Sequence, residues 1–169
     1  MSDKVLIAYG SKYGSTAEIA EAIGQVLREA GFDADVHSAE TVQDLAPYRA
    51  VVLGSGVYAG MWRKEAAQFL EAHQAGLAER PVWLFSSGPS GEGDPVELLD
   101  GWRFPDAQKP IADRISPRDM AVFHGNIDRD KLNLAEKLIV KAVKGEFGDF
   151  RDWDAIRNWA SDVAGALSS

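Results

Sequence analysis

The sequence predicts an α/β fold, a doubly wound five-stranded parallel sheet with helices on both faces. Five short apolar runs recur along the 169 residues, and segments with apolar residues at helical spacing fill the gaps between them. Strands that alternate with helices form right-handed βαβ units, whose crossover helices cover both faces of a parallel sheet. We find no internal repeat, linker or low-complexity tract, so we expect one domain over residues 1–169.

The expected elements follow from the spacing of apolar residues. The strands are predicted at residues 5–8, 34–37, 50–53, 82–85 and 120–123. The first run is apolar throughout, as in a strand that is covered on both faces. Apolar residues every three or four positions predict helices that begin at Thr16 and that span residues 64–73, 132–144 and 152–167, with a shorter one near 106–115.

The first strand and the first helix enclose a polar turn that carries the clearest functional signal. The N-terminus of a helix offers unpaired backbone N–H groups and the positive end of the helix dipole. The hydroxyls of Ser11, Ser15 and Thr16 add donors, and Gly14 lets the backbone bend around a ligand. The turn therefore predicts a phosphate cradle. The alternative is an ordinary connection in which Ser15 only caps the helix, although a cap needs one hydroxyl rather than three.

Two other kinds of phosphate loop do not match this turn. A P-loop would place a lysine directly after Gly14, where this chain has Ser-Thr, and the dinucleotide pattern G-x-G-x-x-G is absent. Dense hydroxyls suit a phosphate monoester that is held by neutral donors. Lys12 is the one formal positive charge of the turn, and the alternative for its long side chain is that it points to water.

The turn also resembles a known cofactor loop. The run Ser11, Lys12, Tyr13, Gly14, Ser15 and Thr16 resembles the FMN-phosphate loop of flavodoxins, usually written S/T-x-T-G-x-T, with Tyr13 in place of the usual threonine. The whole chain is similar to the flavodoxin-type, menaquinone-dependent protoporphyrinogen dehydrogenases through residues 54–62 and 123–153. This resemblance implies a flavodoxin-like strand order, 2-1-3-4-5, and FMN as the cofactor. It also implies a ligand crevice at the carboxyl ends of strands 1 and 3.

In that topology the loops after the third and fourth strands would flank the flavin ring. The candidates after the third strand are Gly56, Val57, Tyr58, Ala59, Gly60, Met61 and Trp62, and those after the fourth are Ser86, Ser87 and Gly88. Trp62 is the first candidate to stack on the ring, and Tyr58 is the second. The alternative for Trp62 is a core anchor that opens the following helix.

No catalytic triad or metal cluster is predicted. The chain has no cysteine, which excludes disulfides, thiol catalysis and Cys-ligated metal centres. His37, His73 and His124 lie on separate expected elements without metal-ligand spacing. Flavin chemistry needs no protein nucleophile, so we expect no catalytic side chain. We expect His124 to be a core or edge histidine, with approach to a ligand as the alternative.

Residues 132–144 predict a helix with a broad apolar face edged by Lys137, Lys141 and Lys144. In an acidic protein such a helix suits a membrane surface, a quinone-bearing partner or a second subunit of a homodimer. The alternative is a helix that covers the sheet and exposes its lysines. No run approaches the roughly 18–20 apolar residues of a membrane span, and no signal peptide precedes the first strand. We therefore expect a cytoplasmic protein, with peripheral contact at the inner face of the membrane as an alternative.

The resemblance implies an FMN-binding oxidoreductase that moves electrons from a reduced substrate to a quinone or another acceptor. One alternative is a non-enzymatic flavodoxin-like electron carrier that docks a redox partner protein. A second alternative is a flavin-free binding module of the same fold. The net charge of −8 argues against nucleic acid as the main partner, whereas a redox partner, a quinone or a small-molecule reductant stays compatible with it.

Overall fold

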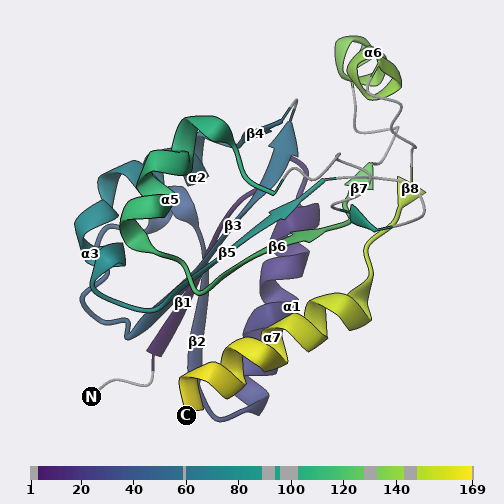
Figure 1. The fold of residues 1–169 in the computed structure, drawn as a ribbon. Helices are drawn as coiled ribbons and strands as arrows, with labels where there is room; N and C mark the ends of the chain where they lie inside the picture. The colour runs from purple at the N-terminus through teal and green to yellow at the C-terminus, as the bar shows by residue number, and fades with distance from the viewer. Residues whose placement is uncertain are drawn as a thin grey trace.

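The computed structural model describes residues 4–58, 60–88, 94–95, 103–127, 133–142 and 148–168. Five parallel strands form its central sheet in the order β2-β1-β3-β5-β6, and a short β4 pairs with the end of β3 (Figure 1). The strands are β1 (Lys4–Gly10), β2 (Asp33–Ser38), β3 (Ala50–Tyr58), β4 (Met61–Trp62), β5 (Val82–Ser87) and β6 (Asp119–Phe123). Numbered along the chain without β4, the parallel strands follow 2-1-3-4-5, so the predicted order is confirmed.

Helices cover both faces of the sheet (Figure 1). One face packs against α1 (Ser15–Glu29) and α7 (Trp153–Ser168), and the other packs against α2 (Lys64–Ala72), α3 (Gln74–Ala78) and α5 (Lys109–Ile115). The remaining elements are η1 (Ala39–Thr41), η2 (Asp106–Gln108), β7 (Asn126–Ile127), α6 (Leu134–Ala142) and β8 (Gly148–Asp149). β7 and β8 pair with each other rather than with the main sheet. The segment from β7 to β8 therefore lies between the last strand of the sheet and the last helix.

Burial on both sides explains the continuous apolar run of β1. Successive side chains of a strand point to opposite faces. Val5 and Ile7 pack on the face of α1 and α7, while Leu6 and Ala8 pack on the face of α2. All four side chains are fully buried.

An aromatic cluster fills the space between the sheet and α7. The ring of Phe85 lies 5.9 Å from that of Phe123 and 6.1 Å from that of Trp159, measured between centroids. Gly54 pairs with Phe85 across β3 and β5. A Cβ on Gly54 would lie 2.0 Å from Phe85 Cζ, so the Phe85 ring occupies the space that any side chain at position 54 would need.

The segment after the third strand differs from its prediction. Residues 55–62 were expected to form a loop, but β3 continues to Tyr58 and turns back into β4, with Val57 opposite Trp62. Gly60 occupies the turn with a φ of 77°, which suits glycine. The β-favouring residues Val57 and Tyr58 extend the strand pattern beyond the glycines. Trp62 accordingly lies in β4, and the next helix opens at Lys64 instead.

Two predicted helices also differ in their bounds. The helix expected over 106–115 consists of η2 followed by α5, in which proline stands in the first turn. The helix expected over 132–144 is α6, and residues 132, 143 and 144 lie outside the described ranges. Figure 1 shows α6 set apart from the sheet, and Leu134 and Leu138 are 75% and 59% exposed. The alternative that this helix covers the sheet is therefore wrong, because α7 and α5 already flank β6.

Gly54→Ala should lower the free energy of unfolding by about 1–3 kcal/mol, because the buried Phe85 ring must move to admit the methyl group. Urea unfolding followed by circular dichroism measures this loss. Gly165→Ala is the matched control, because outside its own helix no described atom lies within 4 Å of the added methyl group. Alanine there should raise stability by about 0.5–1 kcal/mol. Wild-type stability in Gly54→Ala would contradict the packing described for Phe85.

Candidate functional site

The connection between β1 and α1 forms a tight turn at the carboxyl end of the sheet. β1 ends at Gly10, and α1 begins at Ser15 after Gly14, whose φ of 90° lies in the left-handed region. The Oγ of Ser11 accepts a hydrogen bond of 2.9 Å from the Gly14 backbone N–H, which closes the turn. The first helical hydrogen bond runs from Glu18 N to Gly14 O, so the N–H groups just before Glu18 have no partner within the helix. Ser15 is the first helical residue and not the cap.

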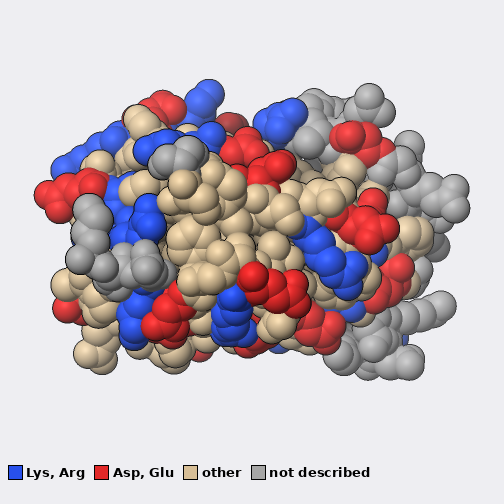
Figure 2. All heavy atoms as spheres, turned by 90° about the horizontal axis from the view of Figure 1, so that it is seen from below, with Lys and Arg blue, Asp and Glu red and all other residues tan. Residues whose placement is uncertain are grey.

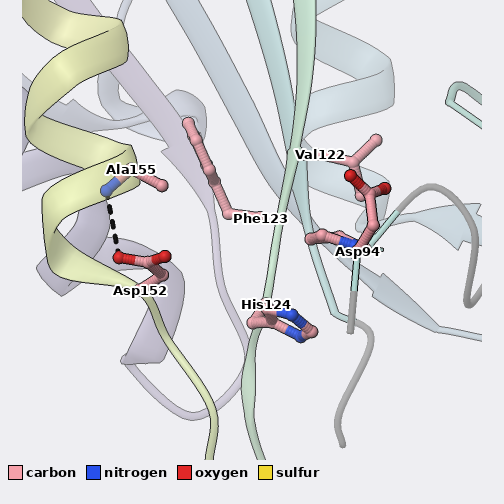
Figure 3. Close-up of a pocket in the computed structure, with 7 residues that line it drawn as sticks. Asp94, Val122, Phe123, His124, Asp152 and Ala155 are labelled. Atoms are coloured by element: carbon pink, nitrogen blue, oxygen red, sulfur yellow. Dashed lines mark hydrogen bonds between the residues drawn. The ribbon is translucent and has the colours of Figure 1, made fainter. Parts of the chain in front are cut away.

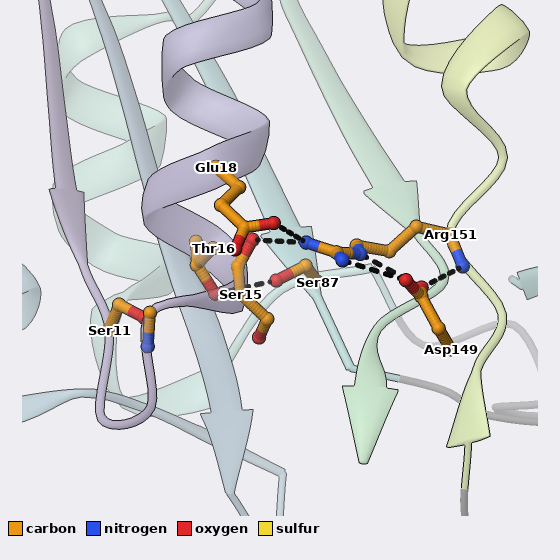
Figure 4. Close-up of polar contacts among 8 residues, drawn as sticks. Ser11, Ser15, Thr16, Glu18, Ser87, Asp149 and Arg151 are labelled. Carbon is orange, nitrogen blue, oxygen red and sulfur yellow. Dashed lines mark hydrogen bonds and ion pairs between the residues drawn. The ribbon is translucent and has the colours of Figure 1, made fainter. Parts of the chain in front are cut away.

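Thr16, Gly56 and Ser87 bring three predicted segments together at this edge of the sheet. Thr16 Oγ1 and Ser87 Oγ lie 2.8 Å apart, and both side chains are buried (Figure 4). Gly56 pairs with Ser87 across β3 and β5, and a Cβ on Gly56 would come within 3.0 Å of Thr16 Oγ1. The Thr16 hydroxyl therefore faces the strands. The Ser11 hydroxyl and the backbone N–H groups remain as donors of the turn itself.

Trp62 is a buried side chain rather than an exposed ring. Its Nε1 donates a hydrogen bond of 2.8 Å to Ser86 Oγ, and its ring meets Phe104 edge-on with centroids 5.0 Å apart. The residue is 5% exposed. These contacts are those of the core-anchor alternative, and the stacking role of Trp62 stays a prediction.

The other residues predicted to contact the flavin ring lie near the same carboxyl edge of the sheet. Val57 lies against Gly88, where an added Cβ would be 3.2 Å from Val57 Cβ, and Gly88 N donates to Phe123 O at 3.2 Å. Met61, next to the turn at Gly60, is 61% exposed. Ala59 and the side chain of Tyr58 lie outside the described part of the chain. The structure thus brings Gly56, Ser87 and Gly88 to one edge but does not place a stacking aromatic there among the described side chains.

Lys12 and Tyr13 turn toward a residue that the sequence analysis did not single out. Lys12 Nζ lies 2.6 Å from Glu136 Oε2, and the Tyr13 hydroxyl donates a hydrogen bond of 2.5 Å to Glu136 Oε1. Glu136 is 7% exposed. The hydrogen bond to Glu136 raises the pKa of the Lys12 ammonium above its usual value. Tyr13 and Lys12 therefore hold a carboxylate of α6 against the outer side of the turn.

Arg151 contacts the same turn from another side (Figure 4). Its Nη1 donates to the backbone oxygen of Ser15 at 3.2 Å and to Glu18 Oε2 at 2.8 Å. Its Nη2 pairs with Asp149 Oδ2 at 2.7 Å, and the guanidinium lies 4.7 Å from the Trp153 ring. The hydrogen bond from Arg151 lowers the pKa of the Asp149 carboxyl. The Arg151 side chain is only 6% exposed, so it ties β8 firmly to the first turn of α1.

Sequence reasoning missed Glu136 and Arg151 as residues of the site. One local signal was present, because Asn133 and Glu136 have the spacing of a capping box. The structure forms that box: Asn133 Oδ1 accepts from Glu136 N at 2.8 Å, and Glu136 Oε1 accepts from Asn133 N at 3.2 Å. The box predicts where α6 begins, but nothing local indicates that its carboxylate meets Lys12, 124 residues away.

A pocket of about 380 Å³ opens beside the end of β6. Figure 3 shows Phe123 and His124 with Asp94 on one side and Asp152 and Ala155, at the start of α7, on the other. His124 is 8% exposed, and its ring lies 6.5 Å from that of Phe150. Within the described residues, no group of three or more His, Cys, Asp or Glu side chains is placed to hold a metal ion.

Comparisons with known proteins agree with this architecture. A family model described as the flavodoxin domain matches residues 6–154. The quinone-dependent protoporphyrinogen IX dehydrogenase of Escherichia coli is 22% identical over 95% of this chain and 94% of its own length. A flavodoxin of Streptococcus pneumoniae superposes with a TM-score of 0.62 at 16% identity, over 96% of this chain and 99% of that one.

A larger protein contains the same fold. The rubredoxin oxygen:oxidoreductase of Desulfovibrio gigas superposes with a TM-score of 0.63 at 15% identity over 99% of this chain. The chain spans only 36% of that protein's length. Both structural likenesses show the fold, and the family points to FMN as the cofactor.

The β1–α1 turn fits a phosphate-bearing group. Apart from its chain neighbours, no described atom lies within 4 Å of a Cβ built on Gly14, so the space beside this residue is open. The turn offers backbone N–H groups and the Ser11 hydroxyl at the positive end of α1. None of the described helices has the length and apolarity that crossing a bilayer requires.

Arg151→Met should lower the free energy of unfolding at pH 7 by on the order of 1–2 kcal/mol, since water screens the partly exposed Glu18 and Asp149. The pKa of Asp149 is lower in the folded protein than in the unfolded chain. The stabilising contribution is thus complete above the ordinary carboxyl pKa of about 4 and declines as the pH falls through the lowered value. Urea unfolding at pH 7 and near pH 3 should show the difference between the two proteins shrinking in acid.

Arg157→Met, in α7, is the control. Arg157 and Asp154 form a pair whose side chains are 56% and 94% exposed, so the change should stay within about 0.5 kcal/mol. An equal loss in both variants would contradict the special position of Arg151, as would a loss in Arg151→Met that does not change with pH.

Proposed function

Because the chain belongs to the flavodoxin domain family, we propose that it is an FMN-dependent oxidoreductase that delivers electrons from a reduced substrate to a quinone. The observation that carries the proposal is the turn at Gly14, whose open space and unpaired N–H groups lie at the switch point between β1 and β3. The 22% identity with a quinone-dependent dehydrogenase over nearly the whole chain supports quinone as the class of acceptor.

The residues of the edge have distinct roles in this proposal. The Ser11 hydroxyl and the first N–H groups of α1 bind the phosphate. Gly56 and Gly88 let the strands pack closely behind the site, against Thr16 and Val57, and the Ser87 side chain is held toward Thr16. FMN supplies the electron-transfer chemistry when it is bound, which leaves the protein to bind it, orient it and control access to it.

The exposed apolar side chains favour an apolar acceptor. Among the described residues the exposed large hydrophobic side chains are Met61, Leu134 and Leu138. Met61 lies on β4 and the two leucines on α6, and both elements stand at the same end of the sheet as the β1–α1 turn (Figure 1). Exposed apolar groups at the end of the molecule that we propose to hold the flavin suit a lipid-soluble quinone or the surface of the membrane that contains it.

Charges of both signs are mixed at the end of the molecule opposite the β1–α1 turn (Figure 2). Figure 2 shows the end at which β1 begins, where acidic and basic side chains are interspersed around uncharged ones. An electron carrier that docks through long-range attraction would present a field of one sign to its partner. The acidic surplus of the chain is not gathered on this end.

Gly14→Ala should weaken FMN binding at least about tenfold, as expected for the loss of one charge-assisted hydrogen bond, and leave riboflavin binding unchanged. The added methyl group would enter the open space beside the turn. Gly31→Ala is the matched control, because Gly31 also has a positive φ, of 97°, and open space around it, but it lies at the far end of α1. Both variants should lose about 1–2 kcal/mol of stability, the cost of a left-handed backbone with a side chain.

Titration of the apoprotein with each flavin, followed by fluorescence, measures these affinities. Equal loss of FMN and riboflavin in Gly14→Ala would place the phosphate elsewhere. If the wild-type protein binds neither flavin, the proposed function itself fails and the flavin-free alternative takes its place.

Replacing both Leu134 and Leu138 with serine should slow reduction of a menaquinone analogue by the pre-reduced protein about ten- to thirtyfold. Each leucine that packs against an apolar acceptor contributes on the order of 1 kcal/mol. FMN content should not change, and reduction of ferricyanide, a water-soluble acceptor, is the control and should keep its wild-type rate. An equal fall with both acceptors, or no fall with either, would contradict an acceptor surface on α6.

A further inference from the structure

The donors of Lys12 and Tyr13 both contact one carboxylate from a distant helix. Lys12 Nζ and the Tyr13 hydroxyl lie 2.6 and 2.5 Å from the two oxygens of Glu136. Both donor residues belong to the turn that we propose to bind phosphate, and Glu136 belongs to α6. The position of α6 and the availability of these donors are therefore linked.

We propose that Glu136 and the phosphate of the cofactor compete for Lys12 and Tyr13, so that Glu136 sets the selectivity for phosphorylated flavin and α6 leaves the turn when the phosphate binds. The inference rests on the proposed function, because it takes the turn to be the phosphate site. It adds Glu136 as a residue that discriminates between FMN and riboflavin. It also makes α6 the element whose position depends on whether a phosphate is bound.

Electrostatics favours exchange over simultaneous binding. A phosphate monoester carries a charge of about −1.5 to −2 near pH 7, which attracts the Lys12 ammonium more strongly than one carboxylate does. A second anion at the same turn would repel the Glu136 carboxylate. Glu136 is 7% exposed, and a buried carboxylate that loses its cationic partner is costly to keep out of water. Movement of α6 away from the turn would return the Glu136 carboxylate to water.

The build of α6 fits a helix that detaches as a unit. Its N-terminal box joins Asn133 to Glu136 within the segment, and Glu136 Oε1 accepts from the Tyr13 hydroxyl as well. Leu134 and Leu138 are largely exposed, so that side of the helix has little packing to lose. A helix of nine residues is not stable alone in water, so its backbone amides should exchange faster once α6 is released.

Hydrogen–deuterium exchange of residues 133–142 in the wild-type protein tests the exchange directly. We expect FMN and inorganic phosphate at high concentration to speed exchange in this segment, and riboflavin to leave it unchanged. Faster exchange with riboflavin as well, no change with either phosphate compound, or slower exchange with FMN would overturn the proposal, since each result separates α6 from the phosphate.

Glu136→Gln tests the same competition through affinity. FMN should bind roughly tenfold tighter to the variant, as expected when one charge-assisted hydrogen bond becomes available, while riboflavin binds as before. Glu29→Gln, an exposed carboxylate in the last turn of α1, is the matched control and should leave both affinities unchanged. Weaker FMN binding in Glu136→Gln would mean that Glu136 helps the turn to bind the phosphate. An FMN affinity equal to that of Glu29→Gln would mean that Glu136 does not act on the phosphate. Either result overturns the proposal.

Lys12→Met provides a second variant if Glu136→Gln does not fold. Its α6 amides should exchange rapidly without any ligand and should not respond to phosphate; a wild-type response would overturn the proposal. Failure of the proposed function is distinguishable, because a protein that binds neither flavin can still be assayed with inorganic phosphate. A phosphate-dependent release of α6 in such a protein would support the competition and reject only the flavin.

Discussion

The left-handed backbone of Gly14 is the constraint on which the site depends. β1 is buried on both faces, and the chain must leave it and enter α1 within a few residues. A left-handed residue makes that reversal possible, and glycine adopts it without steric cost. The turn that results leaves the first N–H groups of α1 without partners inside the helix and places the buried Thr16 hydroxyl against Ser87 of β5. The site is thus a consequence of how a buried strand joins its helix.

The segment between β6 and α7 stabilises this turn from two sides. Glu136 holds Lys12 and Tyr13 on its outer side, and Arg151 holds the first turn of α1 through Ser15 and Glu18. The two contacts have different characters. The Arg151 side chain is nearly buried and pairs with several groups, which suits a permanent attachment, whereas α6 exposes its leucines and meets the turn through one carboxylate. In our proposal the same segment fixes the position of α1 through Arg151 and responds to phosphate through Glu136.

The enzyme and carrier readings differ in what should surround the redox site. A carrier benefits from charge that guides a protein partner, while a quinone-linked enzyme needs apolar access. The described surface has exposed apolar side chains at the site end and mixed charge at the opposite end. The chain resembles a quinone-dependent dehydrogenase along nearly its whole length.

Local patterns in the sequence were sufficient for the α/β class and for the turn between β1 and α1, while its role as a phosphate site stays a prediction. Apolar runs and helical spacing are set by neighbouring residues, so the strands, both helix layers and the turn from Ser11 to Thr16 could be predicted from them, while the strand order followed from the family resemblance. Strand ends were less certain: β3 continued through Val57 and Tyr58 because pairing with β4 outweighed the nearby glycines. Tertiary structure alone decided the partners of single side chains. Trp62 is a buried donor to Ser86, and Lys12 contacts Glu136, 124 residues away. Such contacts depend on how separate elements pack, so the spacing of residues along the sequence does not indicate them.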